Sequence, residues 1–557
     1  MVNYLRSTGE NVCSLNGDSE GIEDNSFHFL AFEGFETMAR IVLVNPRFEK
    51  SYWGLEYALP LVGKKANLPT ACLPLLAAIT PEEHQVTLVD ENIQSIDFDL
   101  LAQADIVGLT GMSVQRKRMR EILTELKRRN IFTVVGGPWV TVHEEYFGEL
   151  ADVIFIGEAE TTWPEFLRAK QTGTHQVRYE QPSKTDMSGV PAPRYDLLDM
   201  NQYLFGSIQI SRGCPFQCEF CDIIVTFGRR PRLKATPQVL VELESLRAKK
   251  MEIAFIVDDN LIGNKQMIKP ILKEVANWQS IHGYPLTFFA EASLDLADDT
   301  ELMELMVACN IQAIFVGVES PKEESLQETK KFQNLRAGGT MIEKIHRIQK
   351  AGMEVWAGMI VGFDNDDEAI FDHQAAFVQE ARVVHVMLGM LTAIPKTPLY
   401  DRLLKDSRLD LADTSEFGTN ILPLRMTRQA LRDGYMRTMK ELNSVDSFFD
   451  RTDSLYLDRN FQFDKARQTY WRKHRRAWAV HQAKTLTRCV ALYWRLMKQV
   501  KEPSLRKEYR KRILRLWKTR RETAALFVYI LKCATHYHYM KLSNDMFRED
   551  LGVTNTF

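Results

Sequence analysis

The sequence predicts an α/β protein in which two parallel-sheet domains are followed by an α-helical region. Short runs rich in Val and Ile alternate with amphipathic stretches over residues 39–170 and again over residues 206–405. Strand signals then disappear after about residue 410. The chain of 557 residues, 45% apolar and 26% charged, is long enough for about three domains of ~150 residues each.

The first alternating region predicts an open sheet with a ligand crevice at one edge. Strands are expected at 40–46, 84–91, 104–112, 132–138 and 152–160. Three of them end in small or polar residues: Thr110-Gly111, Gly136-Gly137 and Gly157-Glu158. Ligands of open α/β sheets bind at such carboxyl ends, although any single glycine could simply serve a turn. No GxGxxG follows the first strand, so a dinucleotide site is not supported.

The second alternating region predicts a curved, partly open barrel of six βα units. A Pro- and Ser-containing stretch, 171–205, reads as the linker before it. Function is expected at the carboxyl ends of the barrel strands. The strands are expected at 207–213, 253–260, 286–293, 313–320, 354–363 and 383–395.

The two ends of the chain differ in character. Residues 1–38 are polar, lack the apolar core of a secretory signal and read as a flexible leader, so that Met38 is an alternative start. Residues 406–557 are expected to be a helical, basic domain, with 20 Lys plus Arg against three Asp plus Glu between 460 and 521. Eight cysteines form no disulfide framework, which favours a reducing cytoplasm.

Three of those cysteines are clustered in RGCPFQCEFCD, directly after the first barrel strand. Cys214, Cys218 and Cys221 therefore sit on the first βα loop, where thiolates could ligate zinc or an iron–sulfur cluster. Structural zinc takes four protein ligands, and no Cys or His nearby in the sequence completes the set. Three thiolates on a four-iron cluster leave one iron open for a substrate, with zinc as the alternative.

The motif resembles the CxxxCxxC signature of the radical S-adenosylmethionine (SAM) superfamily, including the aromatic Phe220 before the last cysteine. The resemblance implies a [4Fe-4S] cluster on Cys214, Cys218 and Cys221 whose open iron binds SAM. It also implies reductive cleavage of SAM to a radical that takes a hydrogen atom from the substrate. The cofactors supply that chemistry, and the protein positions them.

The later barrel strands end in residues that match the same superfamily in order. Their alternative role is that of solvated or helix-capping side chains. The resemblance places SAM contacts at Asp258, Asp259 and Asn260 (amino group), at Glu291, Ser293 and Glu319 (ribose and carboxylate), and at Gly362 (adenine).

A sheet domain ahead of such a barrel resembles the cobalamin-binding class of the superfamily. The resemblance implies a Rossmann-like cobalamin-binding domain and a partial (β/α)6 radical SAM barrel. This sequence departs from other cobalamin domains, because TGMSVQR stands where they have the DxHxxG motif that supplies a lower cobalt ligand. A degenerate sheet that serves only as an interaction surface is the alternative. The implied cobalamin contacts are Asn45, Thr110, Gly111, Gly136, Gly137, Gly157 and Glu158.

The basic helices of the C-terminal region allow two interpretations. One is an amphipathic cap on the barrel, and the other is contact with an anionic membrane surface. No RNA-binding motif supports a nucleic-acid partner. With this extension the chain is similar to the hopanoid C-2 methylase subgroup.

The sequence thus predicts a cytoplasmic, cobalamin-dependent radical SAM enzyme that methylates an unactivated carbon of a small molecule or lipid. A reducing electron donor such as flavodoxin or ferredoxin is expected. Peripheral contact with the membrane is an alternative to a purely cytoplasmic location. Two alternatives keep the same fold: a cobalamin-assisted radical rearrangement or cyclisation without methyl transfer, and a non-catalytic sensor that carries the cluster.

Overall fold

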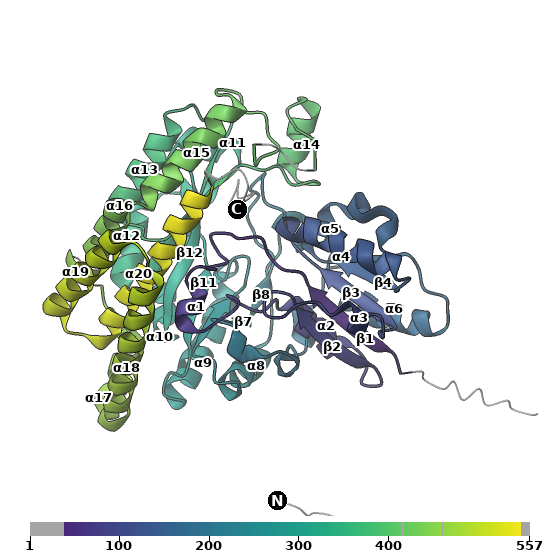
Figure 1. Ribbon diagram of the computed structural model, residues 1–557, viewed down its shortest axis with the longest axis horizontal. Coiled ribbons are helices and arrows are strands. Elements are labelled where there is room, and N and C mark those ends of the chain that lie inside the picture. The colour runs from purple at the N-terminus through teal and green to yellow at the C-terminus, as the bar shows by residue number, and fades with distance from the viewer. Residues whose placement is uncertain (1–37, 414–416, 459–460, 547–557) are drawn as a thin grey trace, which may run out of the picture. The chain divides into compact units, whose positions relative to one another are not determined.

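A computed structural model describes residues 38–413, 417–458 and 461–546 (Figure 1). The expected leader, residues 1–38, lies outside the described residues except for Met38. Within the expected helical domain, 406–557, three short segments also lie outside them: 414–416, 459–460 and 547–557.

Six parallel strands form the first sheet, in the order β2-β1-β3-β4-β5-β6. Five were expected. The sixth strand, β6, lies in residues 171–205, which were expected to be a linker. The linker prediction is wrong for this strand, because β6 pairs with β5 and extends the sheet. The chain reverses direction across the sheet between β1 and β3, which is where open sheets of this kind bind ligands. The strands are β1 (Arg40–Asn45), β2 (Gln85–Asp90), β3 (Ile106–Thr110), β4 (Thr133–Gly136), β5 (Val153–Ile156) and β6 (Arg178–Glu180).

Helices connect these strands and cover the sheet. Between β3 and β4 the buried residues of one helix, Met119, Ile122, Leu123 and Leu126, recur at helical spacing against the sheet. These helices are α2 (Cys72–Ile79), α3 (Phe98–Leu101), α4 (Arg116–Arg128), α5 (Pro138–Val142) and α6 (Thr162–Gln171), while α1 (Leu59–Val62) packs instead against α18 (Arg475–Gln499) of the C-terminal region.

The second sheet contains the six expected barrel strands, all parallel and in consecutive order β7-β10-β11-β12-β13-β14. Within the described residues the two edge strands do not pair, so the barrel is partly open, as predicted. A separate antiparallel pair, β8 (Ser211–Arg212) and β9 (Arg232–Leu233), flanks the cysteine loop. The barrel strands are β7 (Gly206–Ile208), β10 (Ile253–Ile256), β11 (Thr287–Glu291), β12 (Ile311–Glu319), β13 (Glu354–Val361) and β14 (Val386–Met390).

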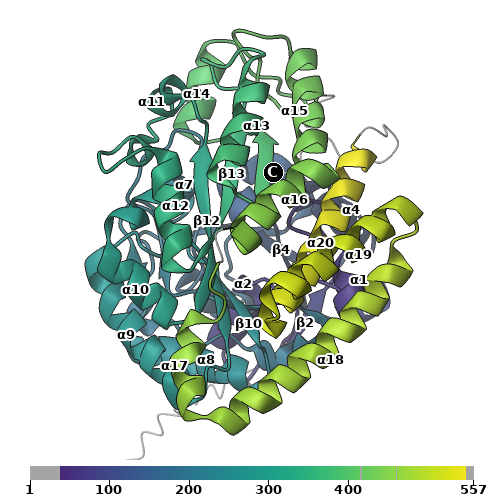
Figure 2. The ribbon, with the colours of Figure 1, turned by 90° about the vertical axis from the view of Figure 1, so that its left-hand side faces the viewer.

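Helices surround the outside of this barrel (Figure 2). Helix α12 shows why they begin and end where they do: Thr340 and Glu343 form a capping box, and Gly352 ends the helix at φ +115°. The helices are α7 (Ile223–Thr226), α8 (Thr236–Ala248), α9 (Lys265–Ile281), α10 (Thr300–Ala308), α11 (Glu323–Glu328), α12 (Met341–Ala351), α13 (Ile370–Ala381) and α14 (Pro398–Lys405).

The described part of the C-terminal region is helical, as predicted. Helix α15 packs beside β14, and it therefore covers that edge of the open barrel. The helices are α15 (Arg428–Leu442), α16 (Val445–Asp453), α17 (Lys465–Lys473), α18 (Arg475–Gln499), α19 (Pro503–Arg520) and α20 (Thr523–Asp545).

Helix α20 is joined to the barrel by buried polar groups. Lys532 Nζ lies 2.7 Å from Glu354 Oε1 at the start of β13, and Tyr456 OH donates to Glu354 Oε2 at 2.5 Å. The loop after β1 reaches the same place, because Tyr52 stacks on Tyr539 of α20 with ring centroids 4.2 Å apart. The barrel, the C-terminal helices and the segment after β1 therefore share one packed core, while each face of the first sheet has a core cluster of its own.

Candidate active site

The three clustered cysteines lie on a loop that the β8–β9 pair closes at its base. Cys214 N donates to Gly228 O at 3.2 Å, and Cys221 N donates to Cys218 O at 3.2 Å. Gly213 adopts φ +94°, and a Cβ there would lie 2.9 Å from Gly228 O, so the turn requires glycine. The loop is thus folded into a defined shape by backbone contacts.

The three thiols form no disulfide, and two of them lie beside side-chain amides: Cys214 beside Asn260 and Cys218 beside Gln333. Cys218 is 7% exposed, and the amide Nε2 of Gln333 lies 3.4 Å from its sulfur. Burial raises the pKa values of the Cys214 and Cys221 thiols, so bound iron would be needed to hold them as thiolates. Three thiols on one loop, with an amide donor beside one sulfur, are a donor set that fits an iron–sulfur cluster. Among the described residues, no three His, Cys, Asp or Glu side chains are grouped to hold a single metal ion.

Asp258 and Asp259, after β10, hold the backbone on which the cysteine loop rests. Asp258 is fully buried; it accepts hydrogen bonds from Ile210 N at 2.7 Å and Ser211 Oγ at 2.6 Å. Asp259 accepts from Gly213 N at 2.7 Å. Both oxygens of Asp258 are therefore engaged by the protein, which differs from the expected contact with an ammonium group. Burial raises the pKa of Asp258 to about 7 and that of Asp259 to about 6.

Asn260, Ser293 and Glu291 do come together at the strand ends. Asn260 Nδ2 donates to Ser293 Oγ at 3.1 Å and lies 3.9 Å from Cys214 Sγ. The carboxyl group of Glu291, at the end of β11, has no hydrogen-bond partner among the described residues. Burial, followed by the nearby Asp259 and Asp258 carboxyls, raises its pKa to about 8. A half-buried carboxyl without a protein partner fits the hydroxyl and ammonium groups that SAM would present.

Glu319, at the end of β12, forms an ion pair on the other side of the cysteine loop. Its Oε1 lies 2.7 Å from Lys331 Nζ, and both side chains are nearly buried. Lys331 also faces the ring of Phe220 at 5.9 Å from the centroid, and its positive charge lies near Cys218 and Cys221. Gly362, after β13, adopts φ +107°, and its N–H donates to Asp366 Oδ2 at 2.9 Å.

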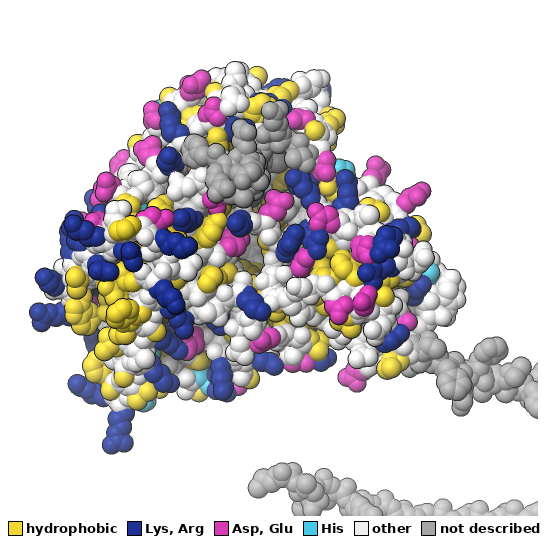
Figure 3. All heavy atoms as spheres, viewed as in Figure 1, with side chains coloured by type: hydrophobic (Ala, Val, Ile, Leu, Met, Phe, Trp, Pro, Cys, Tyr) yellow, Lys and Arg dark blue, Asp and Glu magenta, His cyan; other side chains and the backbone are white. Residues whose placement is uncertain are grey.

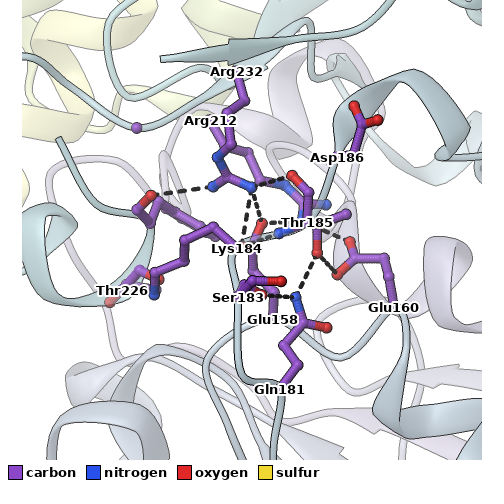
Figure 4. A network of polar contacts seen from close by, with 12 residues as sticks. Glu158, Glu160, Gln181, Ser183, Lys184, Thr185, Asp186, Arg212, Thr226 and Arg232 are labelled. Atoms are coloured by element: carbon purple, nitrogen blue, oxygen red, sulfur yellow. Dashed lines mark hydrogen bonds and ion pairs between the residues drawn. The ribbon is translucent and has the colours of Figure 1, made fainter. Parts of the chain in front are cut away.

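Glu158 joins the first sheet to the cysteine hairpin (Figure 4). Its Oε1 lies 2.7 Å from Arg212 on β8 and 3.0 Å from Arg232 on β9, and its Oε2 accepts from Thr185 N at 3.0 Å. Glu160 adds a second contact to Arg212 at 2.6 Å. The carboxylate expected beside cobalamin is thus engaged by protein partners across the domain boundary.

The other expected cobalamin residues lie at the carboxyl edge of the first sheet. Asn45 Oδ1 accepts from Gln115 Nε2 at 3.0 Å, while a Cβ on Gly137 would lie 2.3 Å from Thr110 Oγ1. Gly157 differs, because at φ +72° its Cβ position has open space around it.

The chemistry at this edge matches what a large cofactor needs. Trp139 Nε1 and His143 Nδ1, on and next to α5, are buried without a hydrogen-bond partner among the described residues. Gly111 and Gly136 lie at the same strand ends: Gly111 O accepts from Trp139 N at 3.1 Å, and Gly136 closes β4. The open backbone position at Gly157 and the unpaired ring nitrogens of Trp139 and His143 fit a bound cobalamin.

Sequence reasoning missed Lys331, Gln333 and the pairing role of Arg232. Gln333 reaches Cys218 across 115 residues of sequence, so no local pattern could have linked them. Arg212 and Arg232 lie on either side of the cysteine motif in the sequence. Their positive charges are the signal that could have predicted an acidic partner such as Glu158.

Three family models match the chain. The B12 binding domain matches residues 65–167, the Radical SAM superfamily matches 208–375, and a domain of unknown function matches 397–550. The first two matches cover the sheet edge and the cysteine loop described above.

Curated relatives match most of the chain. An uncharacterized methyltransferase of Synechocystis sp. is 40% identical over 423 residues, which cover 75% of this chain and 78% of that protein. The hopanoid C-2 methylase of Rhodopseudomonas palustris is 34% identical over 397 residues, which cover 70% of this chain and 75% of that protein. Among solved structures, the radical SAM methyltransferase TsrM of Kitasatospora setae, with cobalamin and a [4Fe-4S] cluster bound, matches with a TM-score of 0.58 at 16% identity. The match covers 80% of this chain and all of that one, and it supports the fold.

Proposed function

This chain belongs to the cobalamin-dependent radical SAM enzymes, and we propose that it methylates an unactivated carbon of a lipid or other small molecule. The observation that carries the proposal is the cysteine loop next to an unpartnered Glu291, in a chain whose relatives at 40% and 34% identity are named as methyltransferases.

When bound, the cluster supplies the electron that cleaves SAM, and cobalamin supplies the methyl group. Cys214, Cys218 and Cys221 would hold the cluster. Glu291 and Asn260 would orient SAM through hydrogen bonds, and the buried strand ends would exclude water from the radical.

The substrate class is proposed from relatedness. The relative from Rhodopseudomonas palustris acts, by its name, on a hopanoid, which is a lipid. Over the described residues no helix combines the length and apolar character required to cross a bilayer. A cytoplasmic location is proposed on a separate ground, the cysteines without disulfides among the described residues, and there the enzyme would meet a lipid from outside the bilayer.

A one-electron carrier such as flavodoxin or ferredoxin is the proposed reductant. Cations contact the cysteine loop: Lys330 pairs with Glu219 at 2.8 Å, and Arg336, which is 55% exposed and 3.7 Å from Asp295, faces the ring of Phe216 at 5.3 Å. The neighbouring Phe332 is 55% exposed. An apolar side chain among positive charges supports docking of an acidic carrier here.

The function is tested by anaerobic reconstitution with iron, sulfide and cobalamin, followed by mass analysis of products from SAM and candidate lipids. We expect S-adenosylhomocysteine, 5′-deoxyadenosine and a product heavier by one CH2 group. Formation of 5′-deoxyadenosine with a product of unchanged mass would instead identify a rearrangement. A reduced, fully loaded protein that leaves SAM intact would identify a sensor.

Cys218→Ala is expected to abolish formation of 5′-deoxyadenosine, because a cluster held by two thiolates loses its defined open iron. The first sheet should stay folded, as circular dichroism and cobalamin binding would report. Cys489→Ala, a buried cysteine on α18, is the matched control and should keep full SAM cleavage. Retained cleavage in Cys218→Ala would contradict the assignment.

A further inference from the structure

Helices α18 and α19 expose large apolar side chains on their outward faces. Trp494 is 68% exposed, Val490 51% and Leu514 57%. We name as the α18–α19 face the exposed Trp478, Val480, Leu486, Val490 and Trp494 of α18, with Leu514 and Trp517 of α19. Figure 3 shows apolar side chains gathered over these helices among blue Lys and Arg side chains.

We propose that the α18–α19 face docks the enzyme on an anionic lipid bilayer. The biological role of this docking rests on the proposed function, because docking would bring the enzyme to its proposed lipid substrate. Binding to a bilayer is nevertheless a property of the surface alone, so it can hold or fail independently of methylation.

The exposed apolar residues are not part of the protein core. Helix α20 packs against both α18 and α19 (Figure 2). On α18 a separate stripe, Cys489, Leu492 and Leu496, is buried toward that core. On α19, Tyr509 and Ile513 are buried in the same way. Each helix therefore has an inner apolar stripe that packs and an outer one that no described residue covers.

The charge of this face is strongly positive. Residues 465–521 contain 20 Lys plus Arg and two acidic residues. Those two acids are held within the protein: Glu502 pairs with Lys541 at 2.9 Å, and Glu508 pairs with Arg512 at 2.7 Å. Exposed cations without an ion pair or hydrogen bond from their side chains to described residues include Lys484, Lys498, Lys507, Arg510 and Lys518.

Trp and Leu among unpaired Lys and Arg are the combination that binds a membrane interface. The apolar side chains enter the boundary between headgroups and acyl chains, while the cations meet anionic headgroups. Nucleic acid would use the charges, but it has no need of Leu514 or Val490. A second copy of this positive face would be repelled by the first.

The test is sedimentation of the full-length protein with vesicles of phosphatidylcholine, with and without phosphatidylglycerol. We expect binding to the anionic vesicles at low salt, little binding to neutral ones, and release as salt rises. Neither SAM nor cofactor is needed, so failure of the methylation assay would not affect the result.

Two pairs of substitutions test the two halves of the argument. Val490→Glu/Trp494→Glu and Lys507→Ala/Arg510→Ala should each weaken binding to anionic vesicles by about tenfold or more. The control is Met267→Glu/Ile281→Glu on α9, where the side chains are 52% and 69% exposed outside this face. It should bind like the wild type.

Three results would overturn the proposal. The first is that the wild type does not bind anionic vesicles. The second is that the α9 control loses as much vesicle binding as the variants of the α18–α19 face. The third is that this face binds a second copy of the chain or RNA in place of a bilayer. A second copy would be identified by a dimer that Val490→Glu/Trp494→Glu dissociates. RNA would be identified by binding that Lys507→Ala/Arg510→Ala removes. Either result counts against the proposal when the wild type does not bind vesicles.

Discussion

At the scale of the residue, Glu291 shows a conflict between stability and function. Its folded-state pKa of about 8 lies above the ordinary 4.5. The folded state therefore binds the proton more tightly than the unfolded state does, and this residue's contribution to stability is lost as pH rises from 4.5 to 8. Glu291→Gln should stabilise the cofactor-free protein at pH 8 by about 2 kcal/mol and much less at pH 5.

Urea unfolding at the two pH values measures this difference, and the same variant should cleave SAM poorly because its carboxylate is gone. Glu323→Gln, an exposed glutamate on α11, serves as the control without a pH-dependent gain. An equal or lower stability of Glu291→Gln at pH 8 would show that the native carboxyl has a partner after all.

At the scale of the element, the β8–β9 hairpin depends on the first sheet through Glu158. The Glu158 side chain is 1% exposed and faces two guanidinium groups. Glu158→Gln should cost about 3 kcal/mol, because it leaves buried positive charge uncompensated. Since Arg212 lies two residues before Cys214, the variant should also retain less iron per chain after reconstitution. Glu180→Gln, on the exposed edge strand β6, should change neither quantity. A normal iron content in Glu158→Gln would show that the β8–β9 hairpin keeps its shape without this contact to the first sheet.

At the scale of the whole molecule, α20 and the barrel are expected to open together. Lys532 and Glu354 are buried partners on α20 and β13, and an isolated barrel would leave Glu354 unpaired. Native-state hydrogen exchange should therefore give the amides of β13 and the middle of α20 similar free energies of opening. Exchange of α20 at much lower free energy than β13 would show that the helical region unfolds as a separate unit.

The sequence was informative wherever a pattern is local. The Val- and Ile-rich strands and the cysteine motif were predicted because periodicity and spacing lie within one short window. Strand β6 was missed because it has only three residues, Arg178–Glu180, and two of them are exposed and charged. Its place in the sheet comes from pairing with β5, which no window of sequence contains.

The site was predicted in part for the same reason. Asn260, Ser293 and Glu291 follow strands and could be ordered from the sequence, but the partners that fix their roles could not. Asp258 reads as a ligand contact until its bonds to Ile210 and Ser211 are seen. Long-range contacts such as that of Lys331 with Glu319 depend on how the loops after the strands fold back over the barrel.

The segment after β1 has a consequence for the order in which the protein is made. The carbonyl oxygen of Ser51 accepts a hydrogen bond from Nε2 of His538, 487 residues later in the sequence, and Tyr52 stacks on Tyr539. A ribosome releases the first sheet long before α20 exists. During synthesis the Tyr52 ring therefore has no stacking partner, and the nascent enzyme completes this part of its interior only when α20 emerges.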